Sequence, residues 1–322
     1  MRRALVTGGG GFVGQWLSRQ LLRQGWAVTG TTMSSAPPPG TLTAEEVRSI
    51  TWRGIDLRPG VDRRSLLGLL ERDRPEAIFH LAAISFVPAA ASDPIRVLDT
   101  NVGATVRLVE ALRLMRVSGT LDPVLLVVGS AEQYGLHERE AMPLTERHEC
   151  RPRTFYAAAK VAQEHFALAA ARADELRAIA TRPFNHSGRG QAAHFLLPAL
   201  VERARAACGN AAASVPIGNT ESVRDFLHVE DVVGAYIALI ERGRAGEVYN
   251  VCSGVGATVG AIAAEVLERA GVSHPLVPDP TLQRAVDVPQ LIGDNAKLRA
   301  DTGWSPTRSR TDIIDDLLNA AT

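Results

Sequence analysis

The chain has 322 residues, 46% hydrophobic and 22% charged, an ordinary composition for one large globular domain or a domain with an added lobe. Its 35 Lys and Arg residues balance 35 Asp and Glu residues, and this zero formal net charge argues against a protein that binds nucleic acid or a membrane surface. No apolar run approaches the ~18 residues that a membrane-spanning helix needs.

The cysteines, the histidines and the N-terminus bear on compartment and metal content. Cys150, Cys208 and Cys252 are odd in number and widely spaced without a CxxC pair, so we expect reduced thiols in a cytoplasmic protein. The first predicted strand begins almost at Met1, so we expect no signal peptide. The eight His residues have no metal-ligand spacing, and no metal is expected.

A glycine-rich turn follows the first predicted strand, residues 3–7, and precedes a helix that we expect to reach Gln24. Gly8 permits a tight turn, Gly11 lets the backbone approach a pyrophosphate, and Gly14 lets the helix pack close to the strand. The first helical residues, Phe12 and Val13, offer unpaired N–H groups to the phosphates. A glycine motif alone can be an ordinary turn, but strand, motif and helix together predict a dinucleotide site.

The end of the second predicted strand, residues 27–30, bears on the choice of cofactor. NAD enzymes often have Asp or Glu there to bind the ribose hydroxyls, whereas this chain has hydroxyl residues, Thr32 among them, and then a Pro-rich loop at 36–40. A position without an acidic side chain can accommodate the 2′-phosphate of NADP. The sequence therefore favours NADP(H), with NAD(H) as the alternative.

Two more strand ends supply candidates for the cofactor site. Strand 50–55 ends at Asp56 and Leu57, where the carboxylate is placed to meet the adenine amino group; a solvated loop aspartate is the alternative. Strand 77–83 ends in Leu81, Ala82 and Ala83, whose small side chains suit close approach of a cofactor. His80 within it is interpreted as a hydrogen-bonded strand residue rather than a catalyst.

A long helix over 93–116 contains Asn101. A buried Asn inside a helix is costly unless it is hydrogen-bonded, so we expect Asn101 to perturb the helix near the cofactor site.

The candidate chemistry lies after the apolar strand 124–128. Ser130 and Glu132 follow its carboxyl end, where doubly wound sheets bind ligands. Tyr156 and Lys160 are four residues apart in a predicted helix to Ala173, so they share one face. An ammonium beside a phenol is expected to lower the tyrosine pKa from about 10 towards neutrality.

With Ser130 holding a carbonyl oxygen and Tyr156 transferring its proton, the set is typical of carbonyl and alcohol redox chemistry. A lone YxxxK pattern is more often a solvated helix face. The glycine motif and Ser130 favour the catalytic interpretation.

The pattern predicts an α/β fold, a doubly wound parallel sheet of the Rossmann type with a smaller mixed α/β substrate-binding lobe. We expect the cofactor domain at 1–182, with later segments from about 219–252 contributing, and an interspersed sugar-nucleotide lobe at 183–322. The second half alternates predicted helices at 195–207, 232–241 and 258–270 with short strands at 215–218, 223–226, 247–250 and near Leu276, and ends in two short helices.

Over essentially its whole length the chain resembles the extended short-chain dehydrogenase/reductase family. The motifs that carry the resemblance are Thr7–Gly14, His80–Ala83, Ser130, Tyr156 with Lys160, Arg182–Asn185 and Arg224–Asp231. Within that family it is most similar to GDP-4-keto-6-deoxy-D-mannose reductases and GDP-mannose 4,6-dehydratases, through Arg182–His186 with Gln191, Val248–Gly254, Arg284–Asp294 and Gly303-Trp304.

The resemblance implies a role for each matching position. Tyr156 is the expected acid/base and Ser130 orients the sugar carbonyl; Lys160 tunes Tyr156 and binds the nicotinamide ribose. The remaining implied contacts are Pro183 with the cofactor, and Ser85, Asn185, Phe195, Arg224, Arg284 and Asp287 with the GDP-sugar. Arg forks suit a diphosphate, and a surface ion pair is the alternative for Arg224 and Arg284.

The segment Ser130-Ala131-Glu132 separates two reactions. Similar dehydratases have Thr-Ser-Glu, and Glu132 is a candidate base for eliminating water, but Ala131 lacks the hydroxyl. We therefore favour reduction of the carbon-4 ketone of GDP-4-keto-6-deoxy-D-mannose to GDP-D-rhamnose. The alternatives are a GDP-mannose 4,6-dehydratase with tightly bound NADP, another nucleotide-sugar reductase or epimerase, and a non-catalytic nucleotide-binding protein.

The resemblance also implies a homodimer through a four-helix bundle, with a tetramer as the alternative. The two long helices near 93–116 and 152–173 are expected to supply it, since they carry more apolar residues than one sheet face needs. The residues in question are Val97, Val102, Leu108, Leu112, Ala159, Phe166 and Ala170. Packing of both stripes on the sheet is the alternative.

Overall fold

The computed structural model describes residues 1–34, 36–37, 39–58, 60, 63–173, 176–209, 214–283 and 288–320. Its centre is a seven-stranded sheet in which each neighbouring pair is parallel, in the order β10-β6-β5-β4-β1-β2-β3. The predicted doubly wound α/β fold is confirmed. The strands are β1 (Arg3–Thr7), β2 (Ala27–Thr32), β3 (Thr51–Gly54), β4 (Ala77–His80), β5 (Val124–Val128), β6 (Ala178–Pro183) and β10 (Val248–Val251).

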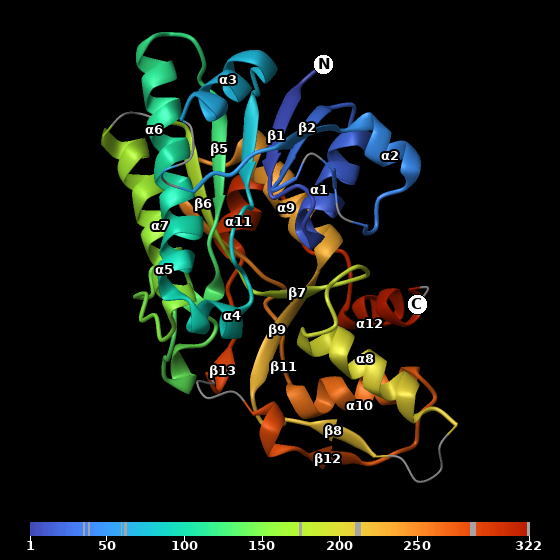
Figure 1. Cartoon of the computed structure of the whole chain (residues 1–322). Helices are drawn as coiled ribbons and strands as arrows, with labels where there is room; N and C mark the ends of the chain where they lie inside the picture. Colours follow the sequence, from blue (N-terminus) through green and yellow to red (C-terminus); the bar gives the residue numbers. More distant parts are fainter. Residues whose placement is uncertain are drawn as a thin grey trace.

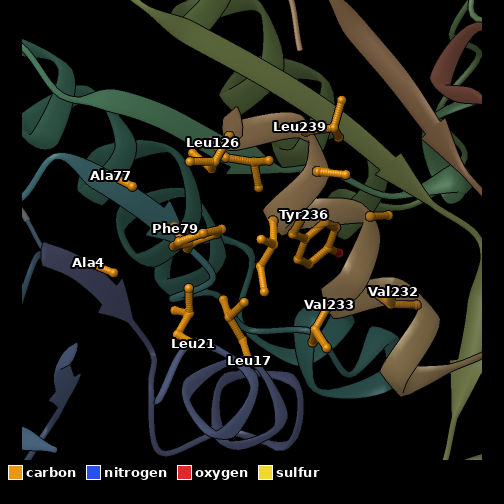
Figure 2. Close-up of a cluster of buried hydrophobic side chains, with 14 of the residues drawn as sticks. Ala4, Leu17, Leu21, Ala77, Phe79, Leu126, Val232, Val233, Tyr236 and Leu239 are labelled. Carbon is orange, nitrogen blue, oxygen red and sulfur yellow. The ribbon is translucent and has the colours of Figure 1, made fainter. Parts of the chain in front are cut away.

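Helices cover both faces of this sheet because its strands are apolar on both sides. Figure 1 shows α6 (Ala104–Val117) and α7 (Phe155–Ala173) along one face, and α1 (Phe12–Arg23) and α9 (Val229–Arg242) along the other. On the second face, Leu17 and Leu21 of α1 and Tyr236 of α9 pack against Phe79 and Leu126 of the strands (Figure 2). The shorter α2 (Ala44–Ser49), α3 (Arg63–Asp73) and α11 (Ala296–Thr302) lie around these layers.

The long helix predicted over 93–116 is interrupted where Asn101 enters it. It consists of α5 (Pro94–Val97), a π-helical segment at Leu98–Gly103, and α6. Asn101 is fully buried, and its amide bonds the main chain of Ile84 twice, accepting from N at 2.8 Å and donating to O at 3.2 Å. The prediction that Asn101 perturbs the helix is confirmed, because the segment that contains Asn101 is π-helical rather than α-helical.

The second half of the chain builds a lobe beyond the carboxyl ends of the central strands (Figure 1). Its larger sheet is β7 (Asn185–Ser187), β9 (Val223–His228), β11 (Gly256–Thr258) and β13 (Gln290–Leu291), and its smaller sheet pairs β8 (Val215–Ile217) with β12 (Leu276–Pro278). Helices α8 (Leu196–Ala207), α10 (Val259–Arg269) and α12 (Arg310–Leu318) enclose the lobe's apolar core.

Two late elements return to the first half of the chain. Strand β10 extends the central sheet beside β6, and α9 lies on its face. Helix α11 packs with both of them in the same core. We propose on this basis that residues 1–182, with α9, β10 and α11, form the cofactor domain and that the remaining later segments form the substrate lobe.

The prediction that an apolar stripe on α5–α6 and α7 joins subunits is wrong for most of its residues. Val97, Val102, Leu108 and Leu112 are buried within the chain, as are Ala159 and Ala170, because the helices pack on one another and on the sheet. Of the stripe only Phe166 is exposed, at 47%. Other large apolar side chains on these helices face outward: Ile95, Leu98, Leu114, Val117 and Phe155.

Candidate active site

A cleft of 1410 Å³ opens where the strand order reverses, between β1 and β4, and extends to the lobe. This is the crevice at the carboxyl ends of the strands where open α/β sheets bind ligands. A pocket for one small ligand is commonly about 300–1,000 Å³, so the cleft has room for a dinucleotide and a second ligand.

The glycine-rich turn forms one wall of this cleft. Gly8 has φ +68°, and a Cβ there would lie 3.0 Å from the Ala82 backbone, so the turn approaches the end of β4 closely. A Cβ on Gly14 would lie 2.5 Å from the Gly8 carbonyl oxygen. Gly11 is the N-cap of α1 and provides no side-chain cap, so the first N–H groups of the helix have no cap acceptor, and Phe12 and Val13 line the cleft. A cofactor pyrophosphate fits this cradle.

The end of β2 contributes a threonine with a buried hydroxyl to the lining of the same cleft. Thr32 lines the cleft, and its Oγ1 is buried with no hydrogen-bond partner among the described residues. The following loop is held from α1: Gln15 Oε1 accepts from Thr41 N at 2.7 Å, and Arg19 pairs with Glu46 at 2.8 Å. An unpartnered hydroxyl at this strand end fits a polar group of a bound adenosine ribose.

Ser130 and Tyr156 meet on the floor of the cleft. Ser130 follows β5 and caps a 3₁₀ turn, Ala131–Gln133, with Oγ accepting from Glu132 N at 3.2 Å. The Ser130 hydroxyl also bonds the Tyr156 phenol, which lowers the tyrosine pKa, but burial outweighs this bond and raises the pKa of Tyr156 to about 12. The nearby Glu132 carboxylate raises it further in the same direction.

The expected effect of Lys160 on Tyr156 is wrong. Lys160 Nζ donates to the Val128 carbonyl at 2.8 Å and lies 5.9 Å from the centre of the Tyr156 ring. Burial lowers the pKa of Lys160 itself from 10.5 to about 7. Desolvation of both groups therefore outweighs the attraction between ammonium and phenolate, which spacing on a helix cannot reveal.

His80 has a structural place, as interpreted from the sequence. Its Nδ1 bonds Thr7 Oγ1 at 2.8 Å and its Nε2 bonds Thr105 Oγ1 at 3.0 Å. Thr105 donates to the Asn101 carbonyl, so it must accept from His80 Nε2–H. Full burial lowers the pKa of His80 to about 3, and the ring stays neutral.

Most of the predicted site residues line the cleft together. From the cofactor set these are Gly8, Gly11, Phe12, Val13, Gly14, Thr32, Leu81, Ala82, Ala83 and Pro183, and from the catalytic and substrate sets Ser85, Ser130, Glu132, Tyr156, Lys160, Asn185 and Phe195. Strand β4 ends at His80, earlier than predicted, so Leu81–Ala83 lie in the loop that faces the cleft.

Four predicted residues lie outside the lining. Asp56 pairs with Arg58 at 2.6 Å, which lowers the pKa of Asp56, and Leu57 is buried in the core beneath α3 and α6. Asn101 lies behind the Ile84 backbone, and Arg224 is 8% exposed and donates to the Val223 carbonyl at 2.8 Å. Arg284 and Asp287 lie outside the described residues.

Several cleft residues were missed by the sequence argument. Phe86 and His194 were not predicted; they contact each other and the predicted Phe195 at ring separations of 4.2–6.0 Å. His186 stacks on Phe12. Tyr236 reaches the cleft from α9, far along the chain. Only His186 had a local signal, since it directly follows the Arg182–Asn185 motif; the others read as ordinary apolar or loop residues.

Within the described part of the chain, no group of three or more His, Cys, Asp or Glu side chains is arranged to hold a metal ion. Among the same residues, no helix combines the length and apolarity that crossing a membrane requires.

The family model for GDP-mannose 4,6 dehydratase matches residues 5–317. Among curated proteins, the GDP-6-deoxy-D-mannose reductase of Pseudomonas aeruginosa is 33% identical over 306 residues, covering 95% of this chain and 92% of that protein. The GDP-6-deoxy-D-talose 4-dehydrogenase of Aggregatibacter actinomycetemcomitans is 30% identical, covering 92% of this chain and 90% of its own.

Two solved structures share the fold over nearly the whole length of both chains. RMD from Pseudomonas aeruginosa, complexed with NADPH, superposes with a TM-score of 0.82 at 31% identity, covering 99% of this chain and 98% of that one. The UDP-glucose 4-epimerase of Thermotoga maritima with UDP-glucose reaches 0.86 at 26% identity, covering 98% of this chain and 97% of that one. The chain belongs to the GDP-mannose 4,6-dehydratase-like family of extended short-chain dehydrogenase/reductase enzymes.

Proposed function

We propose that this enzyme reduces the carbon-4 ketone of GDP-4-keto-6-deoxy-D-mannose to GDP-D-rhamnose. The observation that carries the proposal is the pair of Ser130 and Tyr156, which line the cleft with Lys160 and lie close enough for Ser130 to lower the tyrosine pKa, next to an alanine at position 131. The pair supplies what carbonyl reduction needs from the protein, a donor that holds the oxygen and an acid that protonates it.

Each residue has its own role in the proposed reduction. The Ser130 hydroxyl binds the ketone oxygen and polarises the carbonyl. Tyr156, whose pKa is about 12, is protonated at neutral pH and gives its proton to that oxygen. A nicotinamide cofactor, when bound, would supply the hydride to carbon 4. Lys160 keeps one N–H on the Val128 carbonyl, and its remaining donors would hold the cofactor ribose.

NADPH is the proposed hydride donor. The end of β2 offers the unpartnered Thr32 hydroxyl where NAD enzymes often have an acid, so a 2′-phosphate meets no carboxylate there. The similar structure of RMD is a complex with NADPH, whereas other similar structures are complexes with NAD. Phe12, Val13 and the glycine turn would hold the pyrophosphate, and Pro183 would lie near the nicotinamide.

The GDP-sugar is proposed to enter from the lobe side. Ser85, Asn185 and Phe195 line the cleft between the loop after β4, strand β7 and the start of α8. Arg284 and Asp287 remain predicted contacts of the nucleotide. Arg224 is buried beside this region, and we propose that it supports the lobe side of the cleft.

Dehydration of GDP-mannose is the second candidate, because Glu132 lies in the cleft and is close enough to Tyr156 to raise its pKa. Elimination also needs help for the departing carbon-6 hydroxyl, and Ala131 offers only a methyl group. This difference favours the reductase.

The proposed function is tested by incubating the enzyme with GDP-4-keto-6-deoxy-D-mannose and either NADPH or NADH, followed by NMR of the product. GDP-D-rhamnose formed faster with NADPH supports the proposal. The carbon-4 epimer, GDP-6-deoxy-D-talose, as the product would contradict the assigned stereochemistry, and no reduction with either cofactor would contradict the reaction.

We also propose that two copies pair through α5–α6 and α7. The outward side chains of Ile95, Leu98, Phe155 and Phe166 give these adjacent helices an apolar outer face. Phe155 and Phe166 are eleven residues apart on α7, three turns, and so lie on one side of it. Pairing of two copies about a two-fold axis would cover this apolar outer face on both copies at once.

A further inference from the structure

A buried chain of polar contacts runs from the central sheet to the main chain of Ser130. Arg182, at the end of β6, donates from Nε and Nη2 to the two Glu164 oxygens at 2.8 and 2.6 Å. Glu164 Oε2 also accepts from Gln133 Nε2 at 2.8 Å, and Gln133 Oε1 accepts from Ser130 N at 2.8 Å. The Ser130 backbone is thereby tied to an ion pair.

The contacts define a single arrangement of these groups. The Ser130 N–H can only donate and the Glu164 carboxylate can only accept, so the Gln133 amide has one allowed orientation. Gln133 is fully buried, and the Glu164 and Arg182 side chains are 2% and 6% exposed. Within such burial, an alternative position of the loop would leave polar groups unpaired.

Gly129 leaves the space that this contact needs. A Cβ at Gly129 would lie 2.2 Å from Gln133 Oε1 and 2.6 Å from the Thr181 carbonyl oxygen. The segment between β5 and the 3₁₀ turn therefore packs directly on the Gln133 side chain.

The helix α7 presents three functional positions on one face. Tyr156, Lys160 and Glu164 follow one another at intervals of four residues and are all buried. The same face that carries Tyr156 thus also holds, through Glu164 and Gln133, the loop that carries Ser130. A buried ion pair such as Glu164–Arg182 is by itself a weak source of stability. What this pair distinctively provides is the contact through Gln133 that orients Ser130.

We propose that Gln133, Glu164 and Arg182 are positioning residues that hold Ser130 in hydrogen-bonding register with Tyr156. This inference deepens the proposed reduction and rests on it for its kinetic consequence. The three residues touch neither the sugar ketone nor the hydride donor; they act through the place of the Ser130 hydroxyl.

Gln133→Met tests the proposal, since Met has a similar length but neither accepts from Ser130 N nor donates to Glu164. We expect kcat with the keto sugar nucleotide to fall by roughly 10²-fold, the loss typical of misplacing a reacting group by about 1 Å. The dissociation constant of NADPH should stay unchanged.

The decisive readout is the double variant with Ser130→Ala. If Gln133 acts through Ser130, removing the hydroxyl first leaves nothing for Gln133→Met to misplace, and the double variant turns over at the Ser130→Ala rate. Multiplied losses in the double variant would show a general structural effect and overturn the proposal. If Gln133→Met does not fold, Gln133→Asn, one methylene shorter, takes its place in the same comparison.

Gln163→Met is the matched control. Gln163 is the residue before Glu164 on α7, is equally buried, and bonds Thr105 Oγ1 at 2.7 Å rather than the Ser130 loop. It should leave kcat unchanged, and an equal loss in this variant would contradict the proposal.

Hydrogen exchange of the unliganded enzyme separates this inference from the reaction itself. Lack of turnover by the wild-type protein would refute the proposed reduction alone. The segment 129–135 should still exchange faster in Gln133→Met and not in Gln163→Met, and unchanged exchange in Gln133→Met would refute the positioning contact.

Discussion

Lys160 Nζ donates to the Val128 main-chain carbonyl at 2.8 Å, which joins helix α7 to the carboxyl end of strand β5. The contact places the ammonium beside the site rather than on Tyr156, whose ring centre is 5.9 Å away. Lys160 is therefore a buried amine bonded to the main chain at the site, and Tyr156 is an acid held protonated by burial.

Tyr156→Phe should retain NADPH binding and lose most turnover, because the variant keeps the ring and removes the proton donor. General acid catalysis contributes typically about 10²–10⁴-fold, and a loss of kcat in that range is expected. Cofactor titration and steady-state assays measure the two effects. Turnover within a few-fold of wild type would mean that another group donates the proton.

The pH dependence of kcat/KM should follow the ionisation of Lys160. Its pKa is lowered to about 7, so the ammonium is charged below that pH and neutral above it, and kcat/KM for reduction should decline as pH rises through 7. Tyr156, with a pKa of about 12, stays protonated and adds no decline of its own across this interval. A profile of the reductive rate that is flat from neutrality to pH 9 would contradict this assignment.

Thr32→Asp should turn the cofactor preference against NADPH. A carboxylate at the end of β2 repels a 2′-phosphate and accepts from a ribose 2′-hydroxyl, so the NADPH dissociation constant should rise by about tenfold or more, an effect of 1.4 kcal/mol or more, while that of NADH rises less. Thr32→Asn, equal in size and uncharged, is the control. If Thr32→Asp weakens the binding of NADPH and NADH equally, the 2′ group of the adenosine ribose does not lie beside residue 32.

Phe166→Asp should dissociate the proposed dimer, since it puts a charge on the exposed apolar face of α7. Sedimentation should show wild-type protein at twice the 34.4 kDa chain mass and the variant at the chain mass. Val255→Asp changes a side chain that is 69% exposed on the lobe and should stay dimeric. Wild-type protein that sediments only as the single chain would end the proposal.

The sequence predicted the features that depend on local pattern. Apolar runs marked the parallel strands, the spacing of Gly8, Gly11 and Gly14 marked the turn, and the four-residue interval of Tyr156 and Lys160 placed both side chains in the cleft. These follow from backbone geometry within a few residues, which tertiary packing does not alter.

The features that were missed depend on contacts between distant segments. The tyrosine pKa is set by burial beneath several elements, and Leu108 and Leu112 are buried by neighbouring helices that the apolar pattern cannot identify. Similarly, the sequence analysis assigned no role to Glu164 and named Arg182 only as part of a motif. Only the fold brings them together with Gln133 behind Ser130.

The reaction itself is tested most directly by supplying each candidate substrate to the wild-type enzyme and following NADPH absorbance together with the NMR spectrum of the sugar. With GDP-4-keto-6-deoxy-D-mannose, we predict oxidation of one NADPH for each molecule of GDP-D-rhamnose formed, and with GDP-mannose alone no 4-keto-6-deoxy product. Efficient dehydration of GDP-mannose with no NADPH consumed, and no reduction of the keto sugar, would contradict the reductase and make Glu132 the central base.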